Sequence, residues 1–258
     1  MTKCIFKTLC MKKVISIIII LLSITTNISF SQSNGTVVYK LQIAFDQDAM
    51  DIDKKYGYLQ KAIDVCDKLE YKLIFNGKEA NFFQEKNEDL DKTAVNMANI
   101  LSETPKLGYQ NIEKKILLNE INADRNLVKA NEFVIADSLK TNWTITNESK
   151  LIDNYLCYEA TAVKKVQKGE KEFHENVTAW FCPALPFSFG PTKYGGLPGL
   201  IVELQEKNIA FTLKSISLNN ENKTPIIIPV AKNTISQNDY NKIVNERMET
   251  LQSMIKQK

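Results

Sequence analysis

Histidine is almost absent from this chain, and glycine and cysteine are scarce. His174 is the only histidine among 258 residues, beside nine glycines and five cysteines. A serine or cysteine nucleophile activated by an imidazole would therefore have to use His174. About eight strand residues at about 3.3 Å each separate it from Cys182, so distance excludes a dyad of the two. We interpret His174 as a surface residue of a strand: Glu172 and Glu175 are near it in sequence, but the sequence does not place the set of carboxylates or thiolates that a metal site with one histidine would need.

The sequence also lacks the short motifs that mark common catalytic and cofactor sites. It contains no Gly-x-Ser-x-Gly elbow, Walker A loop, dinucleotide-binding glycine fingerprint, His-Glu-x-x-His or Cys-x-x-Cys. We therefore expect no cofactor and no bound metal, and no catalytic residue is assigned. Acidic residues are plentiful, so a hydrolase that uses a pair of carboxylates stays open as an alternative.

No apolar run is long enough to cross a membrane, which takes about 20 residues. The most apolar stretch is Val14–Leu22, which follows the basic Met11-Lys12-Lys13. This order is typical of a secretory signal peptide, with Ser29 and Ser31 at the −3 and −1 positions. We predict that residues 1–31 are a signal peptide. The mature chain is then periplasmic or secreted and has no transmembrane helix.

An excess of one charge is also lacking once the signal peptide is removed. Residues 1–31 carry four lysines and no acidic residue. The mature chain therefore has 29 basic and 30 acidic residues and a net charge of −1. A near-neutral chain argues against nucleic acid as a partner, because nucleic-acid binding needs a concentrated basic patch.

Alternating apolar and polar residues predict a chain rich in strands. We expect strands near residues 36–45, 71–75, 115–118, 133–135, 142–145, 155–166, 172–183, 201–206, 209–216 and 226–230. Apolar residues at three- and four-residue spacing predict helices at about 53–69 and 236–256, and either a helix or an insertion at 87–101. No repeat or linker divides the chain, so we expect one domain at 32–258 that ends in a C-terminal helix. The predicted fold class is α+β and β-rich: an antiparallel twisted sheet, of which an open half-barrel is one form, with a few helices.

The two longest alternating segments, 155–166 and 172–183, are expected to form a hairpin. If paired residue numbers sum to 339, Tyr158 faces Phe181 and the other apolar residues of the two segments also pair with one another. A slip by one residue would mix the apolar and polar faces, so the pattern selects this register.

The same register places Cys157 beside Cys182 on the opposite face. Disulfides are permitted in an exported protein, and directly opposed strand residues lie within bridging distance. We expect a disulfide between Cys157 and Cys182, with two packed thiols as the alternative. Cys66, on the apolar stripe of the first expected helix, is then either a buried thiol or the partner in an alternative pairing.

Glycine and proline concentrate in residues 190–201, here called the signature loop. It holds four of the nine glycines and two of the seven prolines, so backbone shape is expected to matter more than side chains. We predict a type II turn centred on Pro198 and Gly199, and positive φ for Gly196 or Gly199, with Gly199 as the first choice. The apolar residues should point into the core. The residues that define the loop are Gly190, Pro191, Gly195, Gly196, Leu197, Pro198, Gly199, Leu200 and Ile201.

The signature loop and several segments before it resemble the GLPGLI family of exported Bacteroidetes proteins, for which no activity is established. The matching segments are Trp143-Thr144-Ile145, Asn154-Tyr155-Leu156-Cys157, Ala179-Trp180-Phe181, Leu185-Pro186, Gly190-Pro191 and Gly196–Ile201. Asn154, Phe181 and residues 192–194 depart from the family pattern, and Cys182 is not a position associated with it. The resemblance implies export and a β-rich fold, and it supplies no catalytic residue.

Four aromatic residues lie in or near the signature loop: Trp180, Phe187, Phe189 and Tyr194. A loop stiffened by glycine and proline can present them as a preformed contact surface, and aromatic residues carry much of the energy of interfaces. The alternative is that they fill the core beneath the loop. Our leading hypothesis is a non-enzymatic binding, carrier or accessory protein of the cell envelope, with an unknown ligand or protein partner. The alternatives are a carboxylate-based hydrolase and a purely structural envelope component.

Processing of the N-terminus tests the export hypothesis. We expect the mature protein to begin at or near Gln32, because cleavage follows the small residue at −1. N-terminal sequencing of protein from the soluble periplasmic fraction measures this. A chain that still begins at Met1 or Met11 in that fraction would contradict the prediction.

Overall fold

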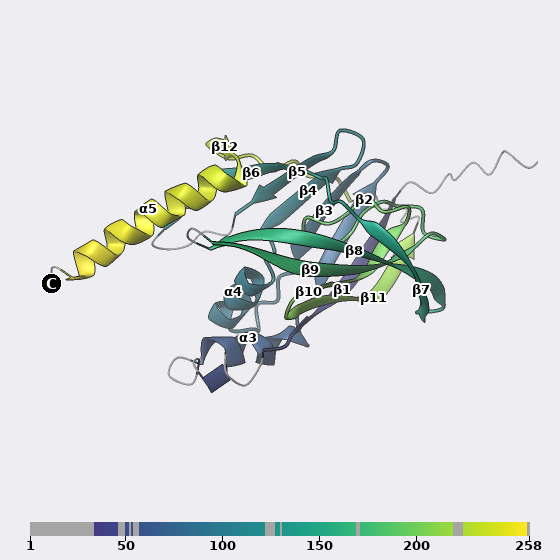
Figure 1. Cartoon of the computed structure of the whole chain (residues 1–258), viewed down its shortest axis with the longest axis horizontal. Coiled ribbons are helices and arrows are strands. Elements are labelled where there is room, and N and C mark those ends of the chain that lie inside the picture. Colours follow the sequence, from purple (N-terminus) through teal and green to yellow (C-terminus); the bar gives the residue numbers. More distant parts are fainter. Residues whose placement is uncertain are drawn as a thin grey trace, which may run out of the picture. The chain divides into compact units, whose positions relative to one another are not determined.

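One twelve-stranded sheet dominates the computed structural model of the chain (Figure 1). The structure describes residues 34–45, 50–51, 53, 57–121, 127–129, 131–168, 171–218 and 224–256. The chain from Asn34 onward forms one compact unit. The expected signal peptide lies outside the described residues.

The strands follow one another across the sheet in the order β12-β6-β5-β4-β3-β2-β1-β11-β10-β9-β8-β7. Their bounds are β1 (Asn34–Ile43), β2 (Tyr71–Asn76), β3 (Glu79–Gln84), β4 (Leu107–Asn111), β5 (Ile116–Glu120), β6 (Phe133–Ser138), β7 (Thr144–Ile152), β8 (Tyr155–Lys168), β9 (Lys171–Cys182), β10 (Leu200–Glu206), β11 (Ile209–Leu218) and β12 (Asn233–Ile235). Neighbouring strands are antiparallel, except that β12 and β6 are parallel. The two end strands, β12 and β7, do not pair within the described part of the chain, so the sheet is open. The expected β-rich, largely antiparallel fold is confirmed.

The hairpin of β8 and β9 has the register that the sequence pattern selects. Tyr158 pairs with Phe181, and Thr161 pairs with Thr178. Both pairs have residue numbers that sum to 339. The alternation of apolar and polar side chains along two adjacent strands therefore suffices to fix this part of the sheet.

The sheet differs from the prediction in three strands that were not expected, β3, β4 and β12, and in one expected strand that does not form. The sequence pattern does not indicate β4, because Gln110 and Asn111 in it are polar and yet buried. The prediction of a strand at 226–230 is wrong, because the segment belongs to no strand of the sheet. It is held instead by the side-chain amide of Asn81, which donates to the Ile227 carbonyl at 2.8 Å and accepts from its N–H at 2.7 Å.

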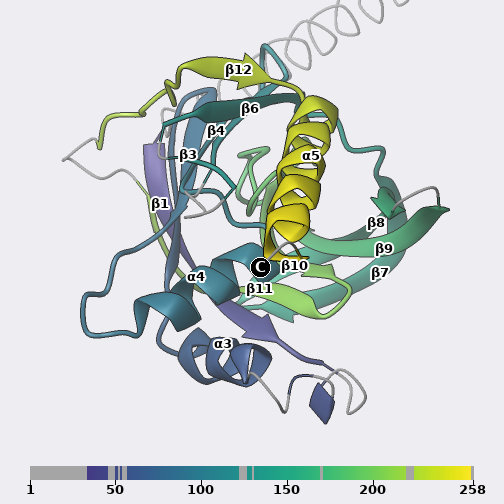
Figure 2. The ribbon, with the colours of Figure 1, turned by 90° about the vertical axis from the view of Figure 1, so that its left-hand side faces the viewer.

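Two helices, α3 (Tyr58–Cys66) and α4 (Lys92–Leu101), pack against each other (Figure 2). The α-helix α3 begins later than expected because Gly57 has φ 63°, outside the helical range. The Asp53 carboxylate accepts hydrogen bonds from the N–H groups of Tyr58 and Leu59, at 3.0 and 2.9 Å, and so caps the first turn. Of the two alternatives for residues 87–101, a helix or an insertion, the structure shows the helix, α4.

The expected C-terminal helix is α5 (Gln237–Lys256). Its contacts with the sheet are with β6 and the residue before it. The Tyr240 ring lies 6.1 Å from the Phe133 ring, edge to face, and the Arg247 guanidinium pairs with Glu132 at 2.6 Å. Most of its other side chains are exposed.

The sheet curves around residues 185–201, which cover its inner face (Figure 2). On that face, the Phe75 ring of β2 lies 4.4 Å from the Phe187 ring and 5.8 Å from the Phe189 ring. The Tyr39 hydroxyl of β1 donates to the Ile201 carbonyl at 2.6 Å. Residues 185–201 therefore belong to the hydrophobic core of the unit.

The two cysteines of the hairpin lie together and are fully buried, as the register requires. In the structure both are free thiols, so the expected disulfide is not formed in it. The Cys157 thiol instead donates to the Tyr155 carbonyl, with Sγ 3.4 Å from the oxygen. Burial and the neighbouring Cys182 thiol raise the pKa of Cys157 to about 12.

The bond between these two thiols stays a prediction for the exported protein. Iodoacetamide added after denaturation without reductant should modify one cysteine, Cys66, and after reduction it should modify three, as measured by intact mass. Replacing Cys157 and Cys182 by serine should lower the free energy of unfolding by at most about 3 kcal/mol, the entropic value for a loop of this size. Three modified cysteines before reduction would exclude the bond.

Candidate functional site

Besides the hydrogen bond from Tyr39, two further side chains of the chain hold the backbone of the signature loop by hydrogen bonds. The side-chain amide of Gln110 in β4 donates to the carbonyls of Gly190 and Thr192, at 3.0 and 2.9 Å. The indole N–H of Trp143, just before β7, donates to the Gly195 carbonyl at 3.0 Å. Gln110 is fully buried, so its two bonds are shielded from water. These contacts fix the backbone of the loop.

The turn inside the loop differs from the expected type II turn. Gly196 has φ 83°, whereas Gly199 is not among the described residues with positive φ. The Gly199 N–H bonds to the Leu197 carbonyl at 2.8 Å, which closes a three-residue turn around Pro198. The predicted positive φ for Gly196 or Gly199 is therefore confirmed at Gly196, whereas the first choice, Gly199, is wrong.

Gly199 is required for a different reason. A Cβ at this position would lie 2.3 Å from the Cys182 carbonyl oxygen and 2.9 Å from the Pro183 nitrogen. Only a residue without a side chain lets the loop pass so close to the end of β9. The apolar residues of the loop are buried, as expected: Leu197, Leu200 and Ile201.

The described residues of the signature loop do not form the expected aromatic contact surface. Phe187, Phe189 and Tyr194 are buried, because they cover the inner face of the sheet. Trp180 is half-buried, and the Lys150 ammonium lies 4.2 Å from its ring centre. For Phe187, Phe189 and Tyr194 the alternative interpretation is correct: they fill the core beneath the loop.

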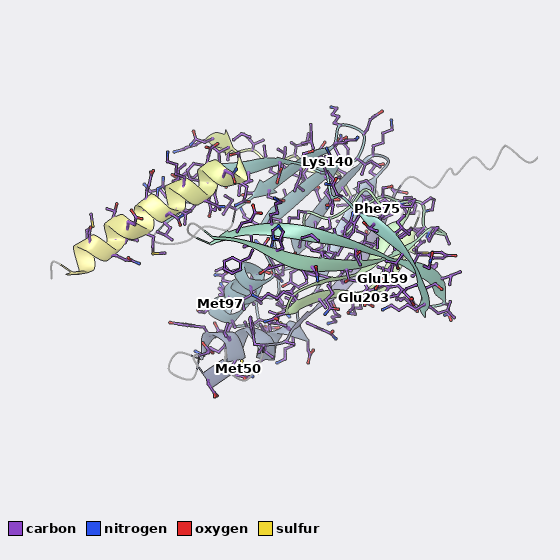
Figure 3. The ribbon with its side chains drawn as sticks, viewed as in Figure 1. Met50, Phe75, Met97, Lys140, Glu159 and Glu203 are labelled. Atoms are coloured by element: carbon purple, nitrogen blue, oxygen red, sulfur yellow. The ribbon has the colours of Figure 1, made fainter. Side chains whose placement is uncertain are left out.

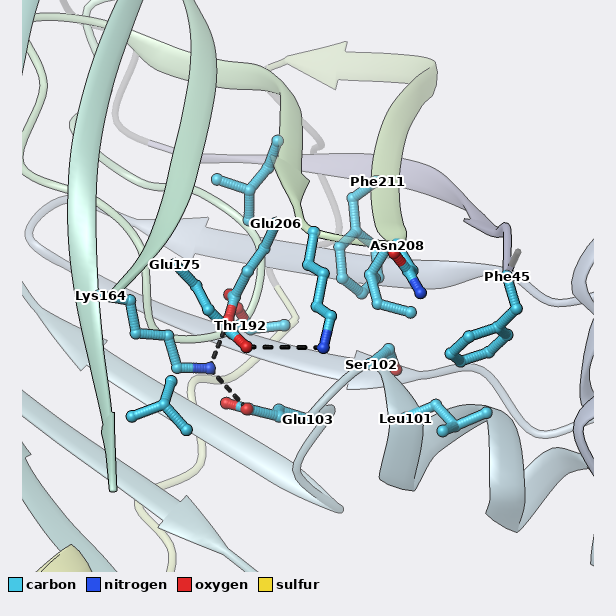
Figure 4. Close-up of a pocket in the computed structure, with 14 residues that line it drawn as sticks. Phe45, Leu101, Ser102, Glu103, Lys164, Glu175, Thr192, Glu206, Asn208 and Phe211 are labelled. Carbon is cyan, nitrogen blue, oxygen red and sulfur yellow. Dashed lines mark hydrogen bonds and ion pairs between the residues drawn. The ribbon is translucent and has the colours of Figure 1, made fainter. Parts of the chain in front are cut away.

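A cleft of about 250 Å³ lies beside the signature loop, where α4, the β8–β9 hairpin and the β10–β11 turn meet (Figure 4). Its apolar lining consists of Phe45, Leu101, Val166, Leu204, Ile209 and Phe211. Its polar lining consists of Ser102, Glu103, Lys164, Glu175, Thr192, Glu206, Lys207 and Asn208. The cleft thus combines an apolar part with a dense group of charges.

The charges of the cleft are joined in a network around Lys164. Its ammonium bonds to Glu103 at 2.6 Å and also contacts Glu206 (Figure 4). Lys193 of the signature loop bonds to the second oxygen of Glu103 at 2.6 Å, and the Tyr194 hydroxyl donates to Glu206 at 2.7 Å. A further pair, Lys207 with Glu175 at 3.6 Å, lies at the side. Every carboxylate that lines the cleft therefore has a lysine partner.

The ionisation of these groups follows from the pairing. Burial opposes charge on Glu103, but Lys193 and Lys164 outweigh it and lower the pKa of Glu103 to about 2. Burial likewise opposes the charge of Lys164, but Glu103 and Glu206 raise its pKa. Burial and the carboxylate of Glu206 raise the pKa of Tyr194. Glu103 and Lys164 are therefore charged at neutral pH, and Tyr194 is protonated.

Two acids do converge in the cleft, as a carboxylate-based hydrolase would require. Glu103 and Glu206 both contact the Lys164 ammonium, so they lie close together. A general acid must be protonated at the working pH, and enzymes raise the pKa of that residue. The pKa of Glu103 is shifted the other way. The lysine between the two carboxylates is typical of a structural ion-pair network.

No metal cluster accompanies these acids: among the described residues, no three His, Cys, Asp or Glu side chains lie close enough together to hold an ion. His174 is on β9 with its side chain more than half exposed, 3.3 Å from Glu172.

None of the helices that the structure describes is long and apolar enough to span a membrane.

Comparisons with known proteins identify a family for the segment that carries the signature. Residues 169–203 match the model of a family described as "Protein of unknown function (Porph_ging)". This segment spans β9, the signature loop and the start of β10, and the match agrees with the resemblance to the GLPGLI family. No curated protein sequence matches the chain.

The comparison with solved structures matches the chain to two structures titled as PNGF-II, in the P21 and in the C2 space group. Each is 12% identical to it, with a TM-score of 0.46 over 83% of this chain. The chain spans only about a third of their length, 34% and 33%. We base no argument about fold or activity on likeness at this level.

The sequence does not indicate the two features that build the site. Gln110 holds the signature loop from 80 positions away in the chain. Glu103, Lys164 and Glu206 come from three separate elements and meet only in the folded sheet. The only indication of the network in the sequence is that charged residues lie near the ends of the expected strands. Charged residues at such positions are equally typical of a solvent-exposed face.

The two central glycines of the signature loop should differ in what they tolerate. Gly196→Ala should cost about 1–2 kcal/mol of unfolding free energy, because only its positive φ opposes a side chain. Gly199→Ala should cost more, because its methyl group would overlap the Cys182 carbonyl. Lys193→Ala, which removes a partly exposed ion pair, should cost at most about 1 kcal/mol. Thermal or urea unfolding measures all three, and a Gly199→Ala variant as stable as the native protein would refute this account of the loop.

Proposed function

We propose that this chain is an exported, non-enzymatic binding protein of the cell envelope that holds a small, largely apolar ligand in the cleft beside the signature loop. The observation that carries the proposal is the cleft itself. It is concave, most of its exposed wall area is apolar, and eight polar or charged residues converge in it, so it combines the two kinds of surface from which ligand sites are built. Its volume of about 250 Å³ suits one small molecule or one end of a longer one.

The charges of the cleft favour an uncharged ligand. Glu103, Glu175 and Glu206 are each already paired with a lysine. A charged ligand would have to separate one of these pairs and leave a partly buried charge without its partner, which is costly. A neutral ligand can lie against Leu101 and Ile209 and leave the network intact.

The export that we propose is consistent with a role in the cell envelope. The apolar run that follows Lys12 and Lys13, and Ser29 and Ser31 before the expected cleavage point, are typical of a signal peptide. The mature chain would then meet hydrophobic molecules of the envelope. A carrier or an accessory protein with a lined cleft fits that setting better than a purely structural component, which needs no concave apolar surface.

Two neighbouring residues of α4 offer a matched test. Leu101 lines the cleft, whereas Ile100 is 62% exposed and does not. The neutral fluorophore N-phenyl-1-naphthylamine should bind the native protein saturably, with increased emission. Leu101→Trp should weaken this binding at least roughly tenfold, or about 1.4 kcal/mol, because the larger ring fills the cleft. Ile100→Trp should leave the affinity unchanged.

Native mass spectrometry of the protein purified from its own envelope adds a second readout. A bound molecule should accompany the native protein and the Ile100→Trp variant, and should be lost from Leu101→Trp. Equal fluorophore binding by both variants, or no saturable binding by the native protein, would refute the proposed use of this cleft. Unfolding curves of both variants show whether the fold is retained.

A further inference from the structure

A second hollow, of about 460 Å³, lies on the other side of the signature loop. Three turns of the sheet contribute a lysine each: Lys78 between β2 and β3, Lys115 between β4 and β5, and Lys140 between β6 and β7. Gly195 and Gly196 of the signature loop complete it. Figure 3 shows Lys140 well away from Met97 of α4, which is the helix that borders the first cleft.

The charge of this hollow is unbalanced, unlike that of the cleft. Three lysines line it beside one carboxylate, Glu113, and that carboxylate contacts Lys78. Within the described residues, no carboxylate lies within ion-pair distance of Lys115 or Lys140. Two of the lysines that line the hollow therefore have no counter-charge among the residues that the structure describes. Like charges held near each other favour the binding of an anion.

The backbone holds the two unpaired lysines in neighbouring positions. The Leu139 N–H donates to the Lys115 carbonyl at 2.9 Å, which joins the turn of one lysine to the segment of the other. Lys115 itself has φ 55°, a conformation set by its tight turn. The backbone positions of the two lysines are thus set by hydrogen-bonded segments at the ends of the strands.

The remaining lining suits an oxyanion. Thr141 and Ser188 add hydroxyl groups, which can donate hydrogen bonds to it. Gly196 is exposed and has no atom within 4 Å of the place where a Cβ would lie, so the loop presents bare backbone to the hollow. A bulky anionic group can therefore approach the loop closely.

We propose that this hollow binds a phosphate group. Lysine ammonium groups act as compact point charges, which suit phosphate, and the two lysines without a carboxylate partner, with two hydroxyls beside them, match one phosphate or diphosphate. A long polyanion would need a broader basic surface than these turns provide. The site uses none of the residues of the apolar cleft, so it goes beyond the function proposed above and can be tested separately.

The test uses the mature chain with two charge-matched double variants. Lys115→Gln with Lys140→Gln removes the unpaired charges of the hollow, and Lys61→Gln with Lys68→Gln removes two exposed charges on and just after α3. Isothermal titration with inorganic pyrophosphate measures binding of a free phosphate compound. Flotation with phosphatidylglycerol vesicles, against phosphatidylcholine vesicles, measures binding of a phosphate headgroup with net negative charge.

The native protein should bind pyrophosphate, phosphatidylglycerol vesicles or both, and raised salt should weaken the binding. The Lys115/Lys140 variant should lose at least roughly tenfold in affinity, and the Lys61/Lys68 variant should lose less than about twofold. Pyrophosphate binding alone identifies a free phosphate ligand, and vesicle binding alone identifies a lipid headgroup. Binding of neither probe by the native protein, or equal losses in the two variants, would overturn the proposal.

Discussion

The inner face of the open sheet has to be covered, and residues 185–201 cover it. A closed barrel buries its interior by joining its first and last strands, but here the end strands do not meet. The aromatic rings of β1, β2 and β3 would otherwise face water. Phe187 and Phe189 pack on Phe75, and hydrogen bonds from Tyr39 and Gln110 fix the covering backbone. The position of both hollows follows, because each uses a different edge of the same loop.

Local patterns allowed the sequence to predict the parts of the fold that depend on neighbours along the chain. The β8–β9 hairpin is the best example, since its register depends on two strands joined by one turn. The helix at 236–256 and most strands are of the same kind. The strand β4 could not be predicted, because Gln110 and Asn111 are buried through bonds to distant partners and not through apolar character.

The signature loop shows where local reasoning ends. Its density of glycine and proline correctly indicated that shape matters, but a local turn pattern assigned positive φ to Gly199. The actual constraint on Gly199 is the carbonyl of Cys182, at the end of another strand. The aromatic residues were open to two interpretations for the same reason: whether Phe189 is exposed or buried depends on Phe75, more than a hundred residues earlier. The network of Glu103, Lys164 and Glu206 was likewise out of reach, because sequence shows charges but not which of them converge.

The pairing of β1 with β11 has a consequence for the order in which the molecule can form. Val37 pairs with Ile216, and the Tyr39 hydroxyl bonds to the carbonyl of a residue 162 positions later. Contacts between such distant residues carry a large entropic cost of loop closure and make folding slow. The strand β1, which comes first along the chain, therefore keeps one edge unpaired until β11, near the end of the chain, is available to pair with it. Such a delay would suit the proposed export, because a chain that is still unfolded can be threaded through a narrow channel and acquire its core on the far side.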